Sequence, residues 1–296
     1  MTPANGPIAV TGATGGLGRR VAERLSAAGV DLRLVVRDAG RSRFLPGSEV
    51  VENPGGYADG DGFAAALDGV HTLYLVSAAE AVDRVEQHRT AVAAAARAGV
   101  RRVVYTSFLG AAPDSVFTLG RHHAATEEAL AASGMAWTAL RHSLYADFVP
   151  ALAVRSDGGA VIAGPAGDGR ASFVSRDDCA DVAAAVLLDD SGALDGRAVG
   201  VTGPAAVSLA EAAAVLTEVS GIPVAYREET VEEAWASRRP SGHPDWEIEG
   251  WISSYTSIAA GEMAAVTDAV PSLTGHPARS LADQLRAHPG DFAHLR

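Results

Sequence analysis

The stretch Val10–Leu25, "VTGATGGLGRRVAERL", decides the fold of this chain. It places Gly12, Gly15 and Gly18 at a regular spacing between a short apolar run and a helical pattern. Glycines in this arrangement allow a tight turn, close approach of backbone N–H groups to a pyrophosphate, and close packing of helix on strand. A lone glycine pattern would also fit an ordinary turn, but the flanking strand, the helix and a second strand at the expected distance all agree. We therefore predict a dinucleotide-binding loop.

Strands and helices are predicted to alternate through the first half of the chain. The predicted strands are apolar through most of their length, which suits strands buried on both faces of a parallel sheet. They cover residues 7–11, 31–37, 49–53, 71–77, 101–107 and 136–141, and the helical patterns include 17–29 and 83–99. This alternation implies right-handed βαβ units, so the predicted fold class is α/β with a doubly wound parallel sheet of the Rossmann type.

The pattern becomes less regular after about residue 143. Residues 158–174 predict short strands joined by Gly and Pro turns, and Asp177 and Asp178 are expected to open a helix, since carboxylates favour its N-terminus. We expect residues 1–150 to form the Rossmann core. Residues 151–296 are expected to form mostly a smaller C-terminal α/β lobe that binds substrate, with some elements returning to the core.

Composition and charge limit the kinds of partner. The 296 residues carry a net charge of −12, which argues against nucleic acid or an anionic membrane, because both need a basic face. There is no apolar run of 18 residues, and the first ten residues lack a signal-peptide pattern, so we expect a cytoplasmic protein. We expect it to be a monomer or a homodimer. The single Cys179 and the scattered histidines predict no metal site.

The end of the second predicted strand indicates which dinucleotide binds. An NAD site usually ends this strand in Asp or Glu, which accepts hydrogen bonds from the ribose hydroxyls. Here the apolar run is followed by Arg37, whose guanidinium can bind a 2′-phosphate bidentately and stack on adenine. A shift of one residue would put Asp38 in that place and favour NAD(H). We expect NADP(H) to be preferred over NAD(H).

Several sequence blocks together resemble one family. They are "TGATGGLG", "VVRD", "RAGVRRVVYTSFLGA", "GMAWTALRHSLYADF" and "GDGRASFVSRDDCADVAAAVL", in this order. With them the chain resembles, over nearly its whole length, the NmrA-like atypical short-chain dehydrogenases, and within that group the bacterial NAD(P)H:quinone oxidoreductase type 2 proteins. The resemblance implies NADPH as cofactor and hydride transfer to a quinone or quinone-like aromatic. Some relatives instead sense the redox state of the cofactor and regulate partners without turnover.

The glycine loop and the resemblance together supply a set of cofactor-binding candidates. These are Thr11, Gly12, Thr14, Gly15, Gly16, Leu17 and Gly18 at the phosphates, Arg37 at the adenosine phosphate, and Ser77, Ser107 and His142 near the ribose and nicotinamide. The chain departs from the family pattern at two of its positions. Gly56 replaces an Asp that lies near adenine in many relatives, and His142 stands where the type 2 quinone reductases tend to have Asn.

The chain contains no lysine, which narrows the chemistry. Standard short-chain dehydrogenases use a tyrosine and a lysine four residues later to protonate a strongly basic alkoxide, and that pair cannot form here. Ordinary ketone reduction and sugar epimerisation by this route are therefore disfavoured. Hydride addition to a quinone gives a far less basic hydroquinone anion, which water or a weak donor can protonate once the two rings are positioned.

The catalytic candidates are Ser107, His123 and Tyr145. His123 falls near the position of the family's lysine, where it could bond the nicotinamide ribose or donate a proton, with Glu127 at i+4 to orient it. The alternative is a surface histidine paired with Glu127. Tyr145 could hydrogen-bond a quinone oxygen or simply pack. A non-catalytic NADP(H)-sensing regulator and a secondary-metabolite tailoring reductase or isomerase remain alternatives, because both need the same cofactor site.

Overall fold

A computed structural model describes residues 6–43 and 45–296, which divide into two compact units. Unit 1 contains the described residues up to Ser107, together with His122–Arg141 and Cys179–Val199, and unit 2 contains Phe108–Arg121, His142–Asp178 and Gly200–Arg296. The units are interleaved in sequence and similar in length, and Cys179–Val199 belongs to unit 1, whereas residues 1–150 were expected to form the core and 151–296 mostly a smaller lobe with some elements returning to the core. The reason is that the chain leaves the sheet of unit 1 after the fifth strand and again after the sixth, and returns to it each time.

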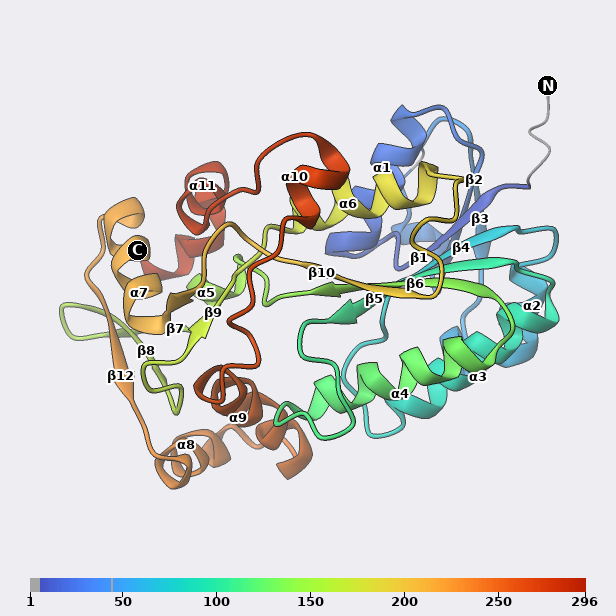
Figure 1. Ribbon diagram of the computed structural model, residues 1–296. Coiled ribbons are helices and arrows are strands. Elements are labelled where there is room, and N and C mark those ends of the chain that lie inside the picture. Colours follow the sequence, from blue (N-terminus) through green and yellow to red (C-terminus); the bar gives the residue numbers. More distant parts are fainter. Residues whose placement is uncertain (1–5, 44) are drawn as a thin grey trace. The chain divides into compact units, whose positions relative to one another are not determined.

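Unit 1 is built on a seven-stranded sheet with helices on both faces. In Figure 1, α1 and α6 lie on one face of the sheet and α2, α3 and α4 lie on the other. The elements that build this sheet and its cover are β1 (Ile8–Thr11), α1 (Gly16–Ala27), β2 (Leu32–Val36), η1 (Ala39–Arg41), β3 (Ser48–Glu52), η2 (Gly56–Ala58), α2 (Gly60–Ala66), β4 (Thr72–Leu75), α3 (Arg84–Arg97), β5 (Arg102–Phe108), α4 (Thr118–Ala132), β6 (Ala136–His142), α6 (Arg176–Leu188) and β10 (Arg197–Val201).

The strand order is β10-β6-β5-β4-β1-β2-β3. β1 pairs in parallel with β2 on one side and β4 on the other, so that Val10 lies opposite both Leu34 and Tyr74. The chain thus moves outward from β1 to β3 and then crosses to β4 on the opposite side of β1. Open α/β sheets bind ligands at such a switch point, beyond the carboxyl ends of the strands. The predicted doubly wound sheet is confirmed.

The local predictions agree closely with the observed elements of unit 1. Residues 31–37 were expected as a strand, and β2 ends at Val36, which makes Arg37 the first residue beyond it. All four residues of β4 are buried, as expected for a strand covered on both faces. Fully buried large side chains such as Phe63 and Leu73 each contribute about 1.5–3 kcal/mol to folding through the apolar surface that they remove from water.

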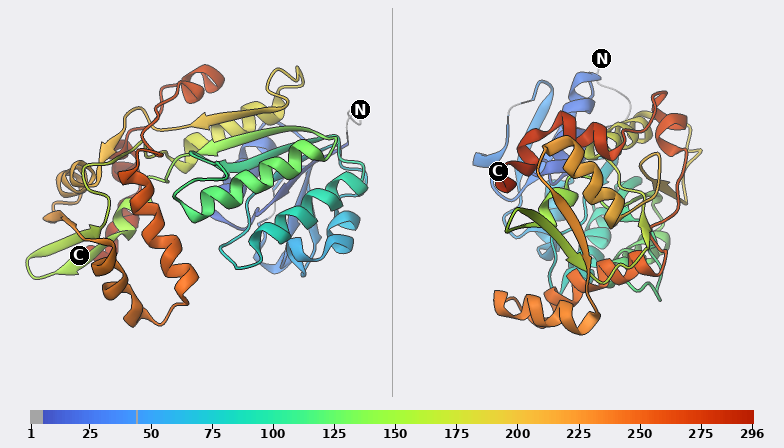
Figure 2. Two further views of the ribbon diagram at one scale, coloured as in Figure 1. Left: turned by 60° about the horizontal axis from the view of Figure 1, so that its bottom comes forward. Right: turned by 90° about the vertical axis from the view of Figure 1, so that its left-hand side faces the viewer.

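Unit 2 contains two small sheets and several helices. β7 and β8 form an antiparallel hairpin that is visible in Figure 2, and β8 also pairs in parallel with β12. β9 pairs with β11 in a short antiparallel sheet. The elements are α5 (Phe148–Ala151), β7 (Ala153–Ser156), β8 (Gly159–Gly164), β9 (Arg170–Ala171), β11 (Val207–Ser208), α7 (Leu209–Ser220), β12 (Val224–Glu228), α8 (Val231–Arg238), η3 (Arg239–Ser241), α9 (Asp245–Ala259), α10 (Ala269–Thr274), α11 (Leu281–Ala287) and η4 (Pro289–Leu295).

Two expectations for this half of the chain are confirmed. β8 and β9 are the short strands predicted within residues 158–174. Asp177 and Asp178 stand in the first turn of α6. Within the described part of the chain, no helix combines the length and the apolar character that a membrane span requires.

Candidate functional site

The glycine loop joins β1 to α1 and needs glycine for two separate reasons. Gly12 has a φ of +62°, a left-handed conformation that side chains other than glycine rarely adopt. Gly18 lies inside α1, where an added Cβ would come within 2.4 Å of the Gly12 carbonyl oxygen. The helix begins after Gly15 with no side-chain cap and no acidic residue in its first turn. Its first N–H groups and its dipole therefore favour an anion at this end.

A pocket of about 590 Å³ opens at the carboxyl ends of β1, β2 and β4. Its lining includes six of the predicted cofactor residues, namely Thr11, Gly12, Thr14, Gly15, Arg37 and Ser77. The other lining residues are Val35, Val36, Arg41, Asn53–Ala58, Phe63, Val76, Ala78–Ala81 and Gln87. Of the remaining loop residues, Gly16 begins α1 and Leu17 is buried in it. The pocket thus occupies the switch point of the sheet.

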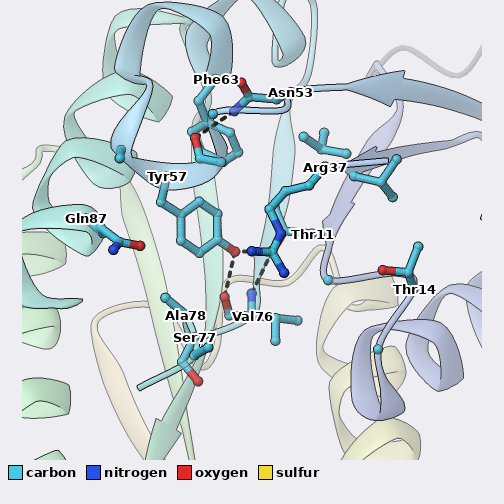
Figure 3. A pocket seen from close by; sticks show the side chains of 18 of the residues that line it. Thr11, Thr14, Arg37, Asn53, Tyr57, Phe63, Val76, Ser77, Ala78 and Gln87 are labelled. Carbon is cyan, nitrogen blue, oxygen red and sulfur yellow. Dashed lines mark hydrogen bonds between the residues drawn. The ribbon is translucent and has the colours of Figure 1, made fainter. Parts of the chain in front are cut away.

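Arg37 and its neighbour Asp38 are used differently. The Arg37 side chain reaches into the pocket in Figure 3, and Arg41 also lines it. The Asp38 carboxylate instead accepts the Gly40 N–H at 2.9 Å and caps the short helix η1. Gly56 adopts a φ of +59° and lies so close to Arg37 that an added Cβ would be 3.5 Å from its Cδ. This end of the pocket is therefore cationic.

The pocket floor is braced by a tyrosine that the sequence did not single out. The Tyr57 hydroxyl lies 2.6 Å from Thr11 Oγ1 and 2.6 Å from the Val76 carbonyl oxygen, as Figure 3 shows. The Val76 N–H in turn donates to Thr11 Oγ1 at 2.8 Å. Burial raises the pKa of Tyr57, so its hydroxyl stays protonated. Thr11 thus links the ends of β1 and β4 beneath the pocket. The only sequence feature that could have pointed to Tyr57 is its place as an aromatic residue shortly after β3.

Ser107, in the C-terminal half of β5, contacts the buried member of a partly exposed ion pair between Glu127 and Arg141. Its hydroxyl donates to Glu127 Oε1 at 2.5 Å, and both side chains are buried. Arg141 donates to both carboxylate oxygens of Glu127, at 2.9 and 2.6 Å. This bidentate contact raises the pKa of Arg141. Sequence reasoning placed Glu127 beside His123, but it did not find Arg141 or its link to Ser107.

His123 is only 5% exposed, so the alternative of a surface histidine is wrong. Its Nδ1 lies 2.8 Å from the Tyr105 hydroxyl, and its Nε2 lies 3.2 Å from the Arg84 guanidinium. Because a guanidinium can only donate, the second contact is a hydrogen bond when Nε2 is unprotonated. This assigns the neutral ring with its proton on Nδ1, from which it donates to Tyr105.

His142 and Tyr145 contact each other within unit 2. His142 Nδ1 lies 3.2 Å from the Tyr145 hydroxyl, and the Arg176 guanidinium stacks 4.5 Å from the centre of the Tyr145 ring. Burial lowers the pKa of His142 to about 3, so the ring is neutral. Its Nε2 is buried and has no hydrogen-bond partner among the residues that the structure describes. A buried polar atom without a partner is costly.

Comparison with known proteins identifies the family. A family model described as NAD(P)H-binding matches residues 12–190, the part of the chain that holds the glycine loop and the pocket. The chain belongs to this NAD(P)H-binding family. It is 33% identical to the NAD(P)H azoreductase of Xenophilus azovorans over 96% of this chain and 99% of that protein.

Solved structures agree with membership of the NAD(P)H-binding family. The NADPH-dependent quinone oxidoreductase of Escherichia coli, solved in complex with NADPH, is 32% identical and has a TM-score of 0.84, over 96% of this chain and 99% of that one. The negative transcriptional regulator NmrA, solved with NAD, is 15% identical with a TM-score of 0.76, over 95% of this chain and 94% of that one. At that identity NmrA shows a shared fold and nothing more.

Proposed function

We propose that this protein is an NADPH-dependent reductase that transfers hydride to a quinone or a quinone-like aromatic acceptor. The observation that carries the proposal is the pocket at the glycine loop, with Arg37 at its adenosine end. Support comes from similarity over nearly the whole chain to an NAD(P)H azoreductase and to an NADPH-dependent quinone oxidoreductase. Quinones and azo compounds are both conjugated acceptors that take up a hydride without forming an alkoxide.

The pocket residues fit a phosphorylated dinucleotide. The glycines at positions 12 and 18 have no side chain that would keep a pyrophosphate away from the backbone N–H groups. The uncapped start of α1 would stabilise the negative charge of the pyrophosphate. Arg37 and Arg41 would hold the 2′-phosphate, which favours NADP(H) over NAD(H). Asp38, the residue that would favour NAD(H), is engaged in capping η1. When bound, NADPH supplies the hydride.

The absence of lysine from the sequence favours an acceptor whose reduced form can be protonated without a strong general acid from the protein. The tyrosine–lysine pair of standard short-chain dehydrogenases lowers the barrier to forming a strongly basic alkoxide, and this chain cannot form that pair. A hydroquinone anion is far less basic, so positioning of two flat rings would supply most of the rate acceleration. Ser107, His123 and Tyr145 are the proposed catalytic residues, and His142, with its buried Nε2, is proposed to contact the nicotinamide end of the cofactor.

The position of His123 limits its proposed role. The Arg84 guanidinium beside Nε2 disfavours a second proton on the ring, so a proton from His123 would leave through Nδ1 toward Tyr105. Tyr105 is fully buried and burial raises its pKa, which makes it a weak acid. We therefore favour a role for His123 in holding the cofactor region over direct proton donation.

The test is rapid-mixing measurement of NADPH oxidation with a panel of acceptors. We expect benzoquinones, naphthoquinones and an azo dye to accelerate oxidation, and a simple aliphatic ketone to have no effect. Tight NADPH binding without acceleration by any acceptor would overturn the reductase and leave a cofactor-sensing protein. The matched variant is Arg37→Gln, which should weaken NADPH binding by about ten- to a hundredfold and leave NADH binding nearly unchanged, since a charge-assisted contact to phosphate is worth about 1.5–3 kcal/mol.

A further inference from the structure

The segment Ser77–Ala81 follows β4 and forms one wall of the pocket. Its residue Ala78 has both backbone groups bound by side chains of α3. The Ala78 N–H donates to Nε2 of His88 at 2.8 Å, and the Ala78 carbonyl oxygen accepts from Nε of Arg84 at 2.9 Å. His88 and Arg84 are 0% and 3% exposed. Buried side chains thus satisfy an irregular backbone segment that has no strand partner at this residue.

The His88 ring is oriented by a chain of hydrogen bonds with only one consistent direction. Because Nε2 accepts the Ala78 N–H, the ring proton must be on Nδ1, which donates to Thr126 Oγ1 at 2.8 Å. The Thr126 hydroxyl then donates to the His122 carbonyl oxygen at 2.9 Å. Thr126 and His122 belong to α4. The acceptor that holds Ala78 is therefore fixed in place by a second helix.

Arg84 also connects Ala78 to α4, through a different set of contacts. Its Nε holds the Ala78 carbonyl oxygen, while its guanidinium lies 3.2 Å from Nε2 of His123 on α4. The rings of Tyr57, His88 and Tyr105 pack in a row between the pocket floor and His123. The ring centroids are 6.2 Å apart for Tyr57 and His88 and 5.9 Å apart for His88 and Tyr105. The pocket wall, the pocket floor and His123 thus share one buried polar and aromatic cluster.

We propose that His88 and Arg84 are positioning residues for the dinucleotide. They hold Ser77–Ala81 in the conformation that NADP(H) binding requires, and they couple this segment to His123. The inference rests on the proposed function and extends it. Without the His88 acceptor, the Ala78 N–H would lose the one hydrogen-bond partner that it has among the described residues, so the segment would move to find water and cofactor binding would have to order it again.

The experiment compares three variants of α3 in the full-length protein. His88→Phe keeps an aromatic ring but removes the acceptor, and it should raise the Kd for NADPH by about five- to a hundredfold, the range expected for an unsatisfied buried donor. His88→Gln can place its carboxamide oxygen where Nε2 was and should recover most of the affinity. Arg89→Gln alters the exposed neighbouring residue of the same helix and should leave the Kd unchanged. Arg89→Gln should also keep the wild-type kcat at saturating NADPH.

Hydrogen exchange without cofactor separates this inference from the proposed function. The peptide that contains Ala78 should exchange faster in His88→Phe than in wild type and in His88→Gln, whether or not the protein turns over any acceptor. Should His88→Phe fail to fold, nitrogen NMR of wild-type His88 still reports whether its proton is on Nδ1. Equal NADPH affinity in His88→Phe and wild type, equal loss in both His88 variants, or a proton on Nε2 would each overturn the inference.

Discussion

Two buried neutral histidines predict that the protein loses stability in mild acid. Burial lowers the pKa of His88 and of His142 from 6.5 to about 3, and the nearby Arg84 charge adds to the effect at His88. In the unfolded chain both groups titrate near their ordinary pKa. Between pH 6.5 and 3 the unfolded state therefore binds more protons than the folded state. The free energy of unfolding rises with pH in this window and falls as the pH drops through it.

The size of this effect follows from the two pKa values. One pKa unit corresponds to about 1.36 kcal/mol, so each shift is worth about 5 kcal/mol when the titration is complete. At pH 5, about 1.5 units below the pKa of histidine in the unfolded chain, each histidine lowers the free energy of unfolding by about 2 kcal/mol, and the pair lowers it by about 4 kcal/mol. The free energy of unfolding of a typical domain is only about 5–15 kcal/mol in total. Mild acid should therefore remove a large part of the stability.

The assay is urea unfolding at pH 7.5 and pH 5.0, followed by tryptophan fluorescence. Wild type should lose about 4 kcal/mol between the two conditions, and His88→Gln should lose only about 2 kcal/mol, because one of the two titrating groups is gone. His294→Gln, which changes an exposed histidine, should behave as wild type. A wild-type loss below about 1 kcal/mol, or an equal loss in wild type and His88→Gln, would refute the argument from burial.

Three further substitutions test the pocket. Gly18→Ala should destabilise the protein by about 1–3 kcal/mol and weaken NADPH binding, because its Cβ would lie 2.4 Å from the Gly12 carbonyl oxygen; Gly290→Ala, with open space around it, is the control in thermal unfolding. Tyr57→Phe removes the hydroxyl that contacts Thr11 and Val76 and should cost about 1 kcal/mol in urea unfolding, while an unchanged midpoint would show that this brace contributes nothing. His123→Ala should weaken cofactor binding or turnover, measured by NADPH titration and steady-state kinetics; unchanged kinetics would make its role structural.

Much of the fold could be predicted because its signals are local. Apolar runs of strand length, glycines at defined spacing and helical patterns ended by glycine each depend on residues close together in the chain. For the same reason Arg37 was correctly placed just beyond β2. The helix start at Asp177 and Asp178 depends only on the dipole of α6 and was likewise predictable.

The contacts around the pocket could not be predicted in this way. The bond from Tyr57 to Thr11 spans 46 residues, and the bond from His88 to Thr126 spans 38. No local pattern separates a histidine that accepts a backbone N–H in the core from one on the surface. The same limit applied to His123, for which a surface position was an open alternative, and to Glu127, whose link to Arg141 was not foreseen.

The sequence by itself determined the order of strands and helices, the glycine loop and the cation at the end of β2, because these follow from periodicity, backbone freedom and charge at neighbouring residues. Only the tertiary structure decided which polar side chains satisfy one another when buried. That choice depends on which elements the sheet brings side by side, and a buried donor or acceptor takes whichever partner is then within reach. The positions of Ala78, His88 and His123 were decided at this level.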